Sequence, residues 1–279
     1  MVSFTDQLGN VVQLNAYPKR IISLVPSQTE LLYDLGLEES VIGITKFCVH
    51  PNTWFTSKTR IGGTKAINIE QIKSLQPDLI FGNKEENVKE QIEALQLIAP
   101  VWLSDINTLE DALNMIFTIG QLTNKAPEAT SLISKIRISF NQLSSNESLA
   151  TNHPPINTAY LIWQNPYMTV GGDTFIGDMI RRCGLQNVFE DQKRYPIVTL
   201  QDLIDHNCKL LLLSTEPFPF TQKHIDALQK QLPAVTILLV DGEMFSWYGS
   251  RLLPAAGYLR QLKTKYTMDW KSIGLKAID

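Results

Sequence analysis

Short apolar runs alternate with helical patterns along this 279-residue chain, and this alternation constrains the fold more than any other feature. The runs at 20–26, 41–45 and 78–82 are rich in β-branched residues, which favour strands. Strands that alternate with helices form a parallel sheet covered by helices, because each parallel pair needs a crossover connection. The sequence therefore predicts an α/β fold.

Capping signals mark where several helices begin. Ser27, with Glu30 three residues later, matches a capping box. Asn68 marks the start of another capped helix, and Thr199 marks one in the second half. The glycine-rich stretch before Asp173 lacks a complete phosphate-binding pattern, so we expect Asp173 to cap a helix there.

A long helical tract separates two regions of strand and helix alternation. Pro127 suits the first turn of a second helix within this tract, after a short break. The only linker-like composition follows it, at 144–155, where Ser, Asn and Pro accumulate. We therefore expect two α/β lobes joined by a long helix, with these boundaries: an N-terminal lobe at 1–107, a connecting segment at 108–145 and a C-terminal lobe at 146–279.

Charge and hydropathy exclude several partners and leave the location open. The formal net charge is -3 and no dense run of Lys and Arg occurs, so we expect no nucleic-acid or anionic-lipid partner. No apolar stretch is long enough to cross a bilayer, and the first residues lack the features of a signal peptide. We expect a cytoplasmic protein if Met1 is native, and a periplasmic protein or membrane-anchored lipoprotein if a signal was removed.

The loops that follow the strands are the expected binding region, because ligands of open α/β sheets lie outside the carboxyl ends of the strands. Phe47 and His50 follow one strand of the first lobe, and Tyr167 follows a strand of the second. Aromatic side chains gather in these loops in both halves. They predict a cleft between the lobes for a bulky, partly apolar ligand.

The stretch after the last predicted strand carries three further candidates. Glu243, Trp247 and Arg251 recur at i, i+4 and i+8, which predicts one half-polar stripe facing the cleft. The alternative is a loop leading into a helix, with a buried indole and an arginine whose head group reaches water.

Metal and catalytic sites are not expected. Cys48 and His50 have C-x-H spacing, but no second pair of ligands follows at metal-site spacing. Cys183 and Cys208 lie among apolar residues and are expected to be buried thiols. No histidine belongs to a known catalytic motif, so no catalytic residue and no cofactor are assigned. The alternative is a cytoplasmic enzyme or chelate-handling protein on the same frame, with Glu243 as a general acid or base.

The segments FTDQLGNVVQL, PKRIISLVPSQTELLYDLGL, VIGIT and INIEQIKSLQPDLIF resemble the helical-backbone substrate-binding proteins of ABC importers. This group carries vitamin B12, ferric siderophores and haem, and the pattern is nearest to its cobalamin-binding members. The resemblance implies two Rossmann-like lobes, each a parallel sheet with flanking helices, and a long backbone helix that restrains their motion. It also implies a monomeric carrier of a metal chelate, without enzymatic activity, whose partner is an ABC permease.

The resemblance also implies which residues contact the ligand. In the first lobe, a tyrosine position of the cobalamin binders falls on His50 next to Phe47, and a tryptophan position falls on Thr64 beside Lys65. The tryptophan of the cobalamin binders is thus absent, and the lysine gained beside it suits an anionic chelate better. The ligand class therefore stays open among corrinoid, haem and ferric siderophore. The corresponding positions of the second half are Trp163, Tyr195, Glu243, Phe245 and Trp247, with Arg251 behind them.

The resemblance also implies docking on a permease. Members of the family use one acidic side chain on each lobe for this contact. Glu70 falls on this position in the first lobe, and Gln201, next to Asp202, falls on it in the second. A glutamine cannot form the charge-assisted pair that makes a carboxylate–arginine contact strong. Independently of the family, Glu70 and Asp202 each lie where a carboxylate stabilises a helix N-terminus.

Overall fold

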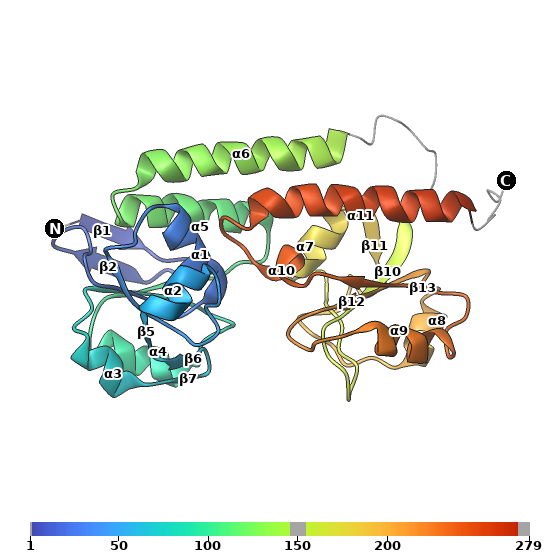
Figure 1. The fold of residues 1–279 in the computed structure, drawn as a ribbon, viewed down its shortest axis with the longest axis horizontal. Helices are drawn as coiled ribbons and strands as arrows, with labels where there is room; N and C mark the ends of the chain where they lie inside the picture. Colours follow the sequence, from blue (N-terminus) through green and yellow to red (C-terminus); the bar gives the residue numbers. More distant parts are fainter. Residues whose placement is uncertain (1, 146–154, 273–279) are drawn as a thin grey trace. The chain divides into compact units, whose positions relative to one another are not determined.

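The structure, a computed structural model, describes residues 2–145 and 155–272, and the chain forms two compact units (Figure 1). Most of the linker-like stretch, and with it His153, lies outside the described residues. The first unit consists of Met1–Ile106, Glu110–Lys135 and Trp247–Arg251, and the second of Asn107–Leu109, Ile136–Ser246 and Leu252–Asp279.

The first unit is built on a five-stranded parallel sheet with the strand order β5-β4-β3-β8-β9. Most residues of this sheet are buried. The longer strands are therefore nearly continuous apolar runs in the sequence. Both faces of such a sheet need cover, and the helices between the strands supply it. The strands are β3 (Ile21–Ser23), β4 (Val41–Ile44), β5 (Thr59–Arg60), β8 (Leu79–Asn83) and β9 (Val101–Ser104).

Helices α1 to α5 and two small antiparallel pairs complete the first part of the chain. The pairs are β1 with β2 and β6 with β7. The expected cap of α3 is confirmed, because the Asn68 side chain accepts a hydrogen bond from the backbone N–H of Gln71. The elements are α1 (Pro26–Asp34), α2 (Asn52–Ser57), α3 (Ile69–Ser74), α4 (Lys89–Gln96), α5 (Leu109–Leu122), β1 (Val2–Thr5), β2 (Val11–Leu14), β6 (Gly62–Gly63) and β7 (Ala66–Ile67).

The capping box predicted for α1 was wrong. The helix begins one residue earlier than Ser27, at Pro26, and its N-cap Val25 makes no side-chain cap. Proline suits the first helical turn because its ring already holds a helical φ and its missing N–H has no partner there. Glu30 is therefore not needed as a cap, and its carboxylate pairs with Arg251 instead.

The second unit contains a four-stranded parallel sheet with the strand order β11-β10-β12-β13. Its core includes Leu161, Leu203, Leu211 and Leu213, all fully buried. The strands are β10 (Ile156–Leu161), β11 (Leu185–Asn187), β12 (Leu210–Ser214) and β13 (Thr236–Val240), and the helices are α7 (Phe175–Arg182), α8 (Leu200–Asp205), α9 (Gln222–Gln229), α10 (Glu243–Ser246) and α11 (Leu252–Ser272). Parallel sheets flanked by helices in both units confirm the predicted α/β class.

Two helix starts in the second unit test the capping signals. The cap predicted at Thr199 is confirmed at the start of α8. At the start of α7 the cap is Thr174, not Asp173, because the Thr174 hydroxyl accepts from the Gly177 N–H at 3.1 Å. Asp173 instead accepts from the backbone N–H of Arg194 at 2.6 Å.

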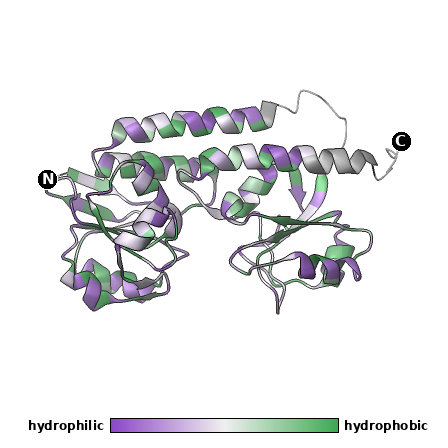
Figure 2. Ribbon diagram, viewed as in Figure 1, coloured by the Kyte–Doolittle hydropathy of each residue, from purple (hydrophilic) through white to green (hydrophobic). Residues whose placement is uncertain are grey.

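The helical tract between the two sheets consists of α5 and α6 (Ala126–Ser145), with Pro127 in the first turn of α6 as expected. Helix α6 belongs to the first unit up to Lys135 and to the second from Ile136. Hydrophilic and hydrophobic residues alternate along it, and Ile136, Phe140 and Leu143 are buried (Figure 2). In the part of the chain that is described, no helix is both long and apolar enough to span a membrane.

Candidate functional site

In the first unit, Trp247 occupies the centre of a small polar and aromatic cluster. Its indole is 8% exposed. The ring centroid of His50 lies 5.6 Å from that of the indole at an angle of 70°. The guanidinium of Arg251 lies 5.0 Å from the same ring, within the range of a cation–π contact. Two predicted site residues, His50 and Arg251, thus contact a third.

Arg251 is held by Glu30 of α1 through two hydrogen bonds. Its Nε donates to Oε2 at 2.9 Å, and its Nη2 donates to Oε1 at 2.6 Å. Both side chains are mostly buried, with exposures of 13% for Arg251 and 18% for Glu30. Burial raises the pKa of Glu30 above its ordinary value, although the hydrogen bond and charge of Arg251 act in the opposite direction.

The continuous stripe predicted from Glu243 to Arg251 does not exist. Helix α10 ends at Ser246 and α11 begins at Leu252. Gly249 lies between them with a φ of +118°, and a Cβ there would lie 3.0 Å from the Ser27 carbonyl oxygen. Because such a backbone breaks the helical repeat, Glu243 belongs to the second unit while Arg251 belongs to the first. The non-helical segment nevertheless brings Arg251 onto Trp247.

The remaining predicted residues of the first unit lie at its surface. Phe47 is exposed, with the Nζ of Lys46 at 5.2 Å from its ring centroid. Lys65 is exposed and donates to the Glu85 carbonyl at 2.9 Å, while Thr64 is half-buried. Glu70 is exposed in the first turn of α3.

Cys48 and His50 differ in burial, and only His50 is partly exposed. Its thiol is fully buried and accepts a hydrogen bond from the Thr29 hydroxyl at 3.0 Å. Burial raises the pKa of this thiol above its ordinary value, which disfavours the thiolate. Among the described residues, no group of three or more His, Cys, Asp or Glu side chains is arranged to hold a metal ion.

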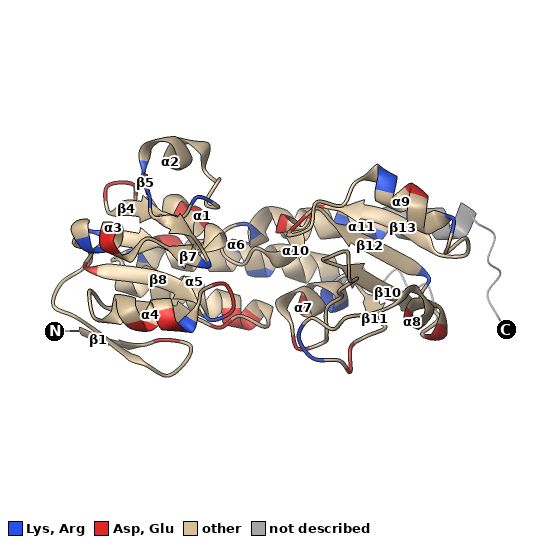
Figure 3. Ribbon diagram, turned by 90° about the horizontal axis from the view of Figure 1, so that it is seen from below, with Lys and Arg blue, Asp and Glu red and all other residues tan. Residues whose placement is uncertain are grey.

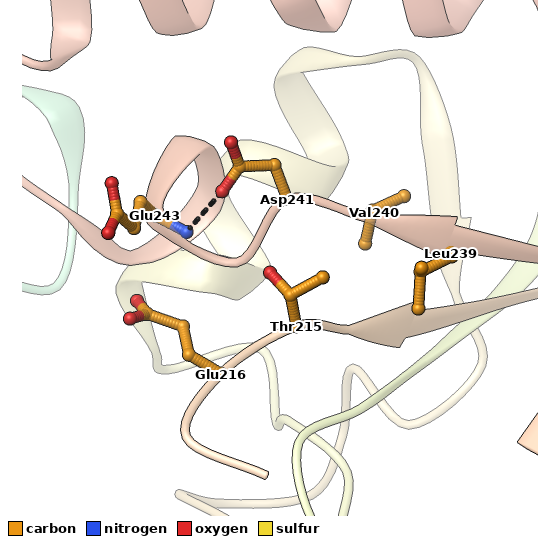
Figure 4. Close-up of a pocket in the computed structure, with 6 residues that line it drawn as sticks. All are labelled: Thr215, Glu216, Leu239, Val240, Asp241 and Glu243. Atoms are coloured by element: carbon orange, nitrogen blue, oxygen red, sulfur yellow. Dashed lines mark hydrogen bonds between the residues drawn. The ribbon is translucent and has the colours of Figure 1, made fainter. Parts of the chain in front are cut away.

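The second unit has a cavity of about 430 Å³ at the carboxyl ends of β12 and β13 (Figure 4). Figure 4 shows the carboxylates of Glu216 and Glu243 extending to the same side of the strand ends. The Ser246 hydroxyl donates to Glu216 Oε1 at 2.7 Å, and Asp241 Oδ1 accepts from the Glu243 N–H at 3.0 Å. The cavity is acidic, and it is lined by Thr215, Glu216, Leu239, Val240, Asp241 and Glu243.

Aromatic side chains lie in the loops after β10, β11 and β12. Trp163 is 40% exposed, and its ring packs against that of Phe218 at 5.7 Å. Tyr167 is half-buried against the core, and Tyr195 is half-buried with the Arg194 guanidinium 5.8 Å from its ring.

Phe245 does not fit its predicted role. Its side chain is 0% exposed and packs against Tyr160, with ring centroids 5.0 Å apart, and against Tyr258 at 6.4 Å. A fully buried ring offers no surface to a ligand, so Phe245 is a core residue of the second unit. Side chains two residues apart on a helix face different directions, which is why Phe245 packs inward while Glu243 lines the cavity.

The two docking candidates of the second unit are engaged within α8. Gln201 is exposed and donates to the Asp205 carboxylate at 2.8 Å. Asp202 accepts from the N–H of Thr199 at 2.7 Å and from its hydroxyl at 2.8 Å. The Asp202 N–H donates to the same hydroxyl at 3.2 Å, which completes a capping box. These hydrogen bonds lower the pKa of Asp202 below its ordinary value.

Several residues of these candidate sites were not assigned from the sequence. Thr215 and Asp241 line the cavity, and Glu30 holds Arg251. Position directly after a strand could have indicated Thr215 and Asp241, because strand ends carry binding residues in this fold class. No local signal could have indicated Glu30, since its partner is 221 residues away.

Comparison with known proteins identifies the family. A family model described as periplasmic binding protein matches residues 21–236. A vitamin B12-binding protein of Pectobacterium atrosepticum is 26% identical over 248 residues, 86% of this chain and 87% of that protein. The crystal structure of the periplasmic vitamin B12-binding protein of Vibrio cholerae has a TM-score of 0.75 and 20% identity, and the match covers 90% of this chain and 98% of that chain.

A periplasmic haem-binding protein from Roseiflexus sp. RS-1, in its apo form, shares the fold with a TM-score of 0.74 and 21% identity, covering 88% of this chain and 98% of that chain. The family match runs from β3 to the start of β13 and so includes strands of both sheets. The chain therefore belongs to the periplasmic binding protein family.

Proposed function

We propose that this protein is the substrate-binding component of an ABC importer and that its ligand is a bulky metal chelate. The relatives include proteins named for vitamin B12 and for haem, and this chain shares their fold. The family consists of binding proteins, which favours binding over the enzyme alternative. In this proposal the protein works on the outer side of the cytoplasmic membrane, where an importer collects its substrate.

The observation that carries the proposal is the gathering of aromatic and charged side chains near the carboxyl ends of the strands in each unit. The first unit has His50 after β4, in contact with Trp247. The second has Trp163 after β10 and a cavity after β12 and β13. Aromatic faces suit the flat, partly apolar surface of a chelate, and we propose these side chains as ligand contacts.

The acidic cavity favours one kind of chelate. Carboxylates of Glu216, Asp241 and Glu243 line it, and no Lys or Arg belongs to its lining among the described residues. A ligand edge that carries carboxylates would meet like charges there, whereas an edge with amide N–H donors would find acceptors. We therefore propose a corrinoid as the ligand in preference to haem, whose propionates are anionic.

Titration of the purified protein with cyanocobalamin, haemin and a ferric hydroxamate, followed by tryptophan fluorescence, tests both proposals. We expect saturable quenching, with cyanocobalamin bound more tightly than haemin. Trp163→Ala should weaken binding by about tenfold, since a stacked aromatic ring contributes about 1 kcal/mol or more. Phe117→Ala, which removes another exposed ring on helix α5, is the matched control and should bind normally.

Saturable binding of none of these chelates would refute the proposed function. Tighter binding of haemin than of cyanocobalamin would refute only the assignment of the ligand class.

A further inference from the structure

Two side chains of the first unit contact the indole of Trp247. His50 meets the indole at a ring-centroid distance of 5.6 Å, and the guanidinium of Arg251 lies 5.0 Å from it. The backbone that carries the indole is not helical, because α10 has ended and α11 has not begun. Tertiary contacts, not a helical repeat, therefore decide where this ring lies.

Glu30 holds the guanidinium of Arg251. An arginine side chain has several rotatable bonds, and a fork of two parallel hydrogen bonds to one carboxylate removes most of that freedom. Here both hydrogen bonds are short, at 2.6 and 2.9 Å, and both partners are mostly shielded from water. Glu30 lies on α1, whose own capping does not use its carboxylate. The pair thus joins a helix of the first unit to the segment that carries Trp247.

Without the carboxylate, the guanidinium would be a largely buried charge lacking its fork partner, and it would turn toward water. The indole would then lose a cation–π contact, which is stronger in a shielded position than at an exposed one. The ring would keep only part of its packing and would take up more than one orientation. The chain of contacts therefore runs from Glu30 to Arg251 to Trp247.

We propose that Glu30 is a positioning residue for ligand binding, which acts through Arg251 to hold the indole of Trp247 against His50. The inference rests on the proposed function, because it takes this ring as part of the chelate-binding set. Glu30 itself need not touch the ligand.

The first experiment tests the orientation of Trp247 without any ligand. The chain contains five tryptophans, and incorporation of 5-fluorotryptophan makes each visible by ¹⁹F NMR. Single Trp→Phe variants assign the resonances. We expect Glu30→Gln to shift or broaden the Trp247 resonance while leaving the Trp102 resonance, which belongs to a fully buried ring of β9, in place. An unchanged Trp247 resonance would overturn the inference.

The second experiment is a double-mutant cycle on affinity, with cyanocobalamin, haemin and ferric desferrioxamine as the probes. For any probe that the unaltered protein binds, Glu30→Gln should weaken binding about fivefold, the size of a moderately shielded cation–π contact. In a Trp247→Leu background, the same change should weaken binding less than about twofold, because the aromatic ring through which Glu30 acts is gone. Equal losses in both backgrounds would mean a general structural role and would overturn the inference.

Two further variants sharpen the result. Arg251→Lys keeps a positive charge near the indole but loses the fork, so it should fall between the unaltered protein and Glu30→Gln in both experiments. Glu93→Gln breaks an exposed ion pair on α4, in which the side chains of Glu93 and Lys89 are 59% and 82% exposed, and should change neither readout.

The outcomes separate this inference from the proposed function. If the unaltered protein binds none of the three probes, the proposed function fails, and the Trp247 resonance alone decides whether Glu30 holds the indole. If the unaltered protein binds a probe and Glu30→Gln binds it equally well, only the positioning role fails.

Discussion

At the scale of single residues, burial controls the chemistry of the three cysteines. The thiols of Cys48, Cys183 and Cys208 are all buried. Removal from water disfavours the thiolate, so the pKa of Cys183 is raised to about 12 and that of Cys208 to about 11. The pKa of Cys48 is raised by burial as well. These are structural thiols, as the sequence predicted for Cys183 and Cys208.

We expect all three thiols to react slowly in the folded protein. Because the thiolate is the nucleophile, Ellman's reagent at about pH 8 should modify them at least about 100-fold more slowly than it modifies the unfolded chain. The measurement compares the rate of absorbance change with and without urea. A thiol that reacts in the folded protein as fast as in urea would contradict the buried positions.

Some charged side chains pair with a residue nearby in the sequence, and others pair with a residue far along the chain. In Figure 3, Lys and Arg are interspersed with Asp and Glu along the described parts of both units. Asp202 meets Thr199 three residues away, whereas Glu30 meets Arg251 from the far end of the chain. A local pattern can predict only the first kind of contact.

At the scale of secondary-structure elements, the N-terminus of α8 is stabilised by its capping box, in which Thr199 and Asp202 satisfy each other's backbone N–H groups. The pKa of Asp202 is lower in the folded protein than its ordinary value of 3.8. A carboxyl with a lowered folded pKa contributes stability above its unfolded pKa and loses it as the pH falls through the folded value.

Asp202→Asn should therefore lower the urea midpoint of unfolding at neutral pH and have a smaller effect at a pH well below 3.8. Asp226→Asn, on α9, removes an exposed carboxylate that accepts from Gln222, and it serves as the control. Urea unfolding followed by circular dichroism at the two pH values measures the difference. Equal effects of Asp202→Asn at both would show that the capping box does not depend on the charge.

Helix boundaries near the end of the chain depend on one backbone conformation. Gly249 has a φ of +118°, which ends the helical repeat between α10 and α11. A side chain there would also meet the Ser27 carbonyl oxygen at 3.0 Å. The i, i+4 spacing of Glu243 and Trp247 is therefore not evidence of a shared helical face, because no single helix contains both.

At the scale of the whole molecule, the proposed partner is an ABC permease, and Glu70 is the proposed contact of the first unit. Its carboxylate is exposed in the first turn of α3. In the second unit, the capping box engages Asp202, and the exposed neighbour Gln201 is uncharged. The charge-assisted part of docking should therefore depend mainly on Glu70.

Glu70→Ala should impair uptake of the chelate by cells that produce only the variant, while leaving the affinity of the purified protein unchanged. Glu90→Ala, in the first turn of α4, removes an equivalent exposed carboxylate and should leave uptake unchanged. Normal uptake with Glu70→Ala would contradict the docking role.

Much of the fold could be predicted because its signals are local. The apolar runs became β3, β4 and β8, and the signals at Asn68 and Thr199 became helix caps. Strand and helix periodicities act over a few residues, so a sequence window contains them fully. The site was predicted less completely, because burial and pairing across the chain are not local properties.

The amino-acid sequence by itself determined the α/β class and the long helical tract, and it placed the proposed ligand contacts in the loops after the strands. Only the tertiary structure decided that Phe245 is buried, that Glu30 pairs with Arg251 and that Trp247 packs against His50. The physical reason is distance along the chain. Backbone periodicity is set by neighbouring residues, whereas the surroundings of a side chain are set by whichever segments the folded chain packs around it.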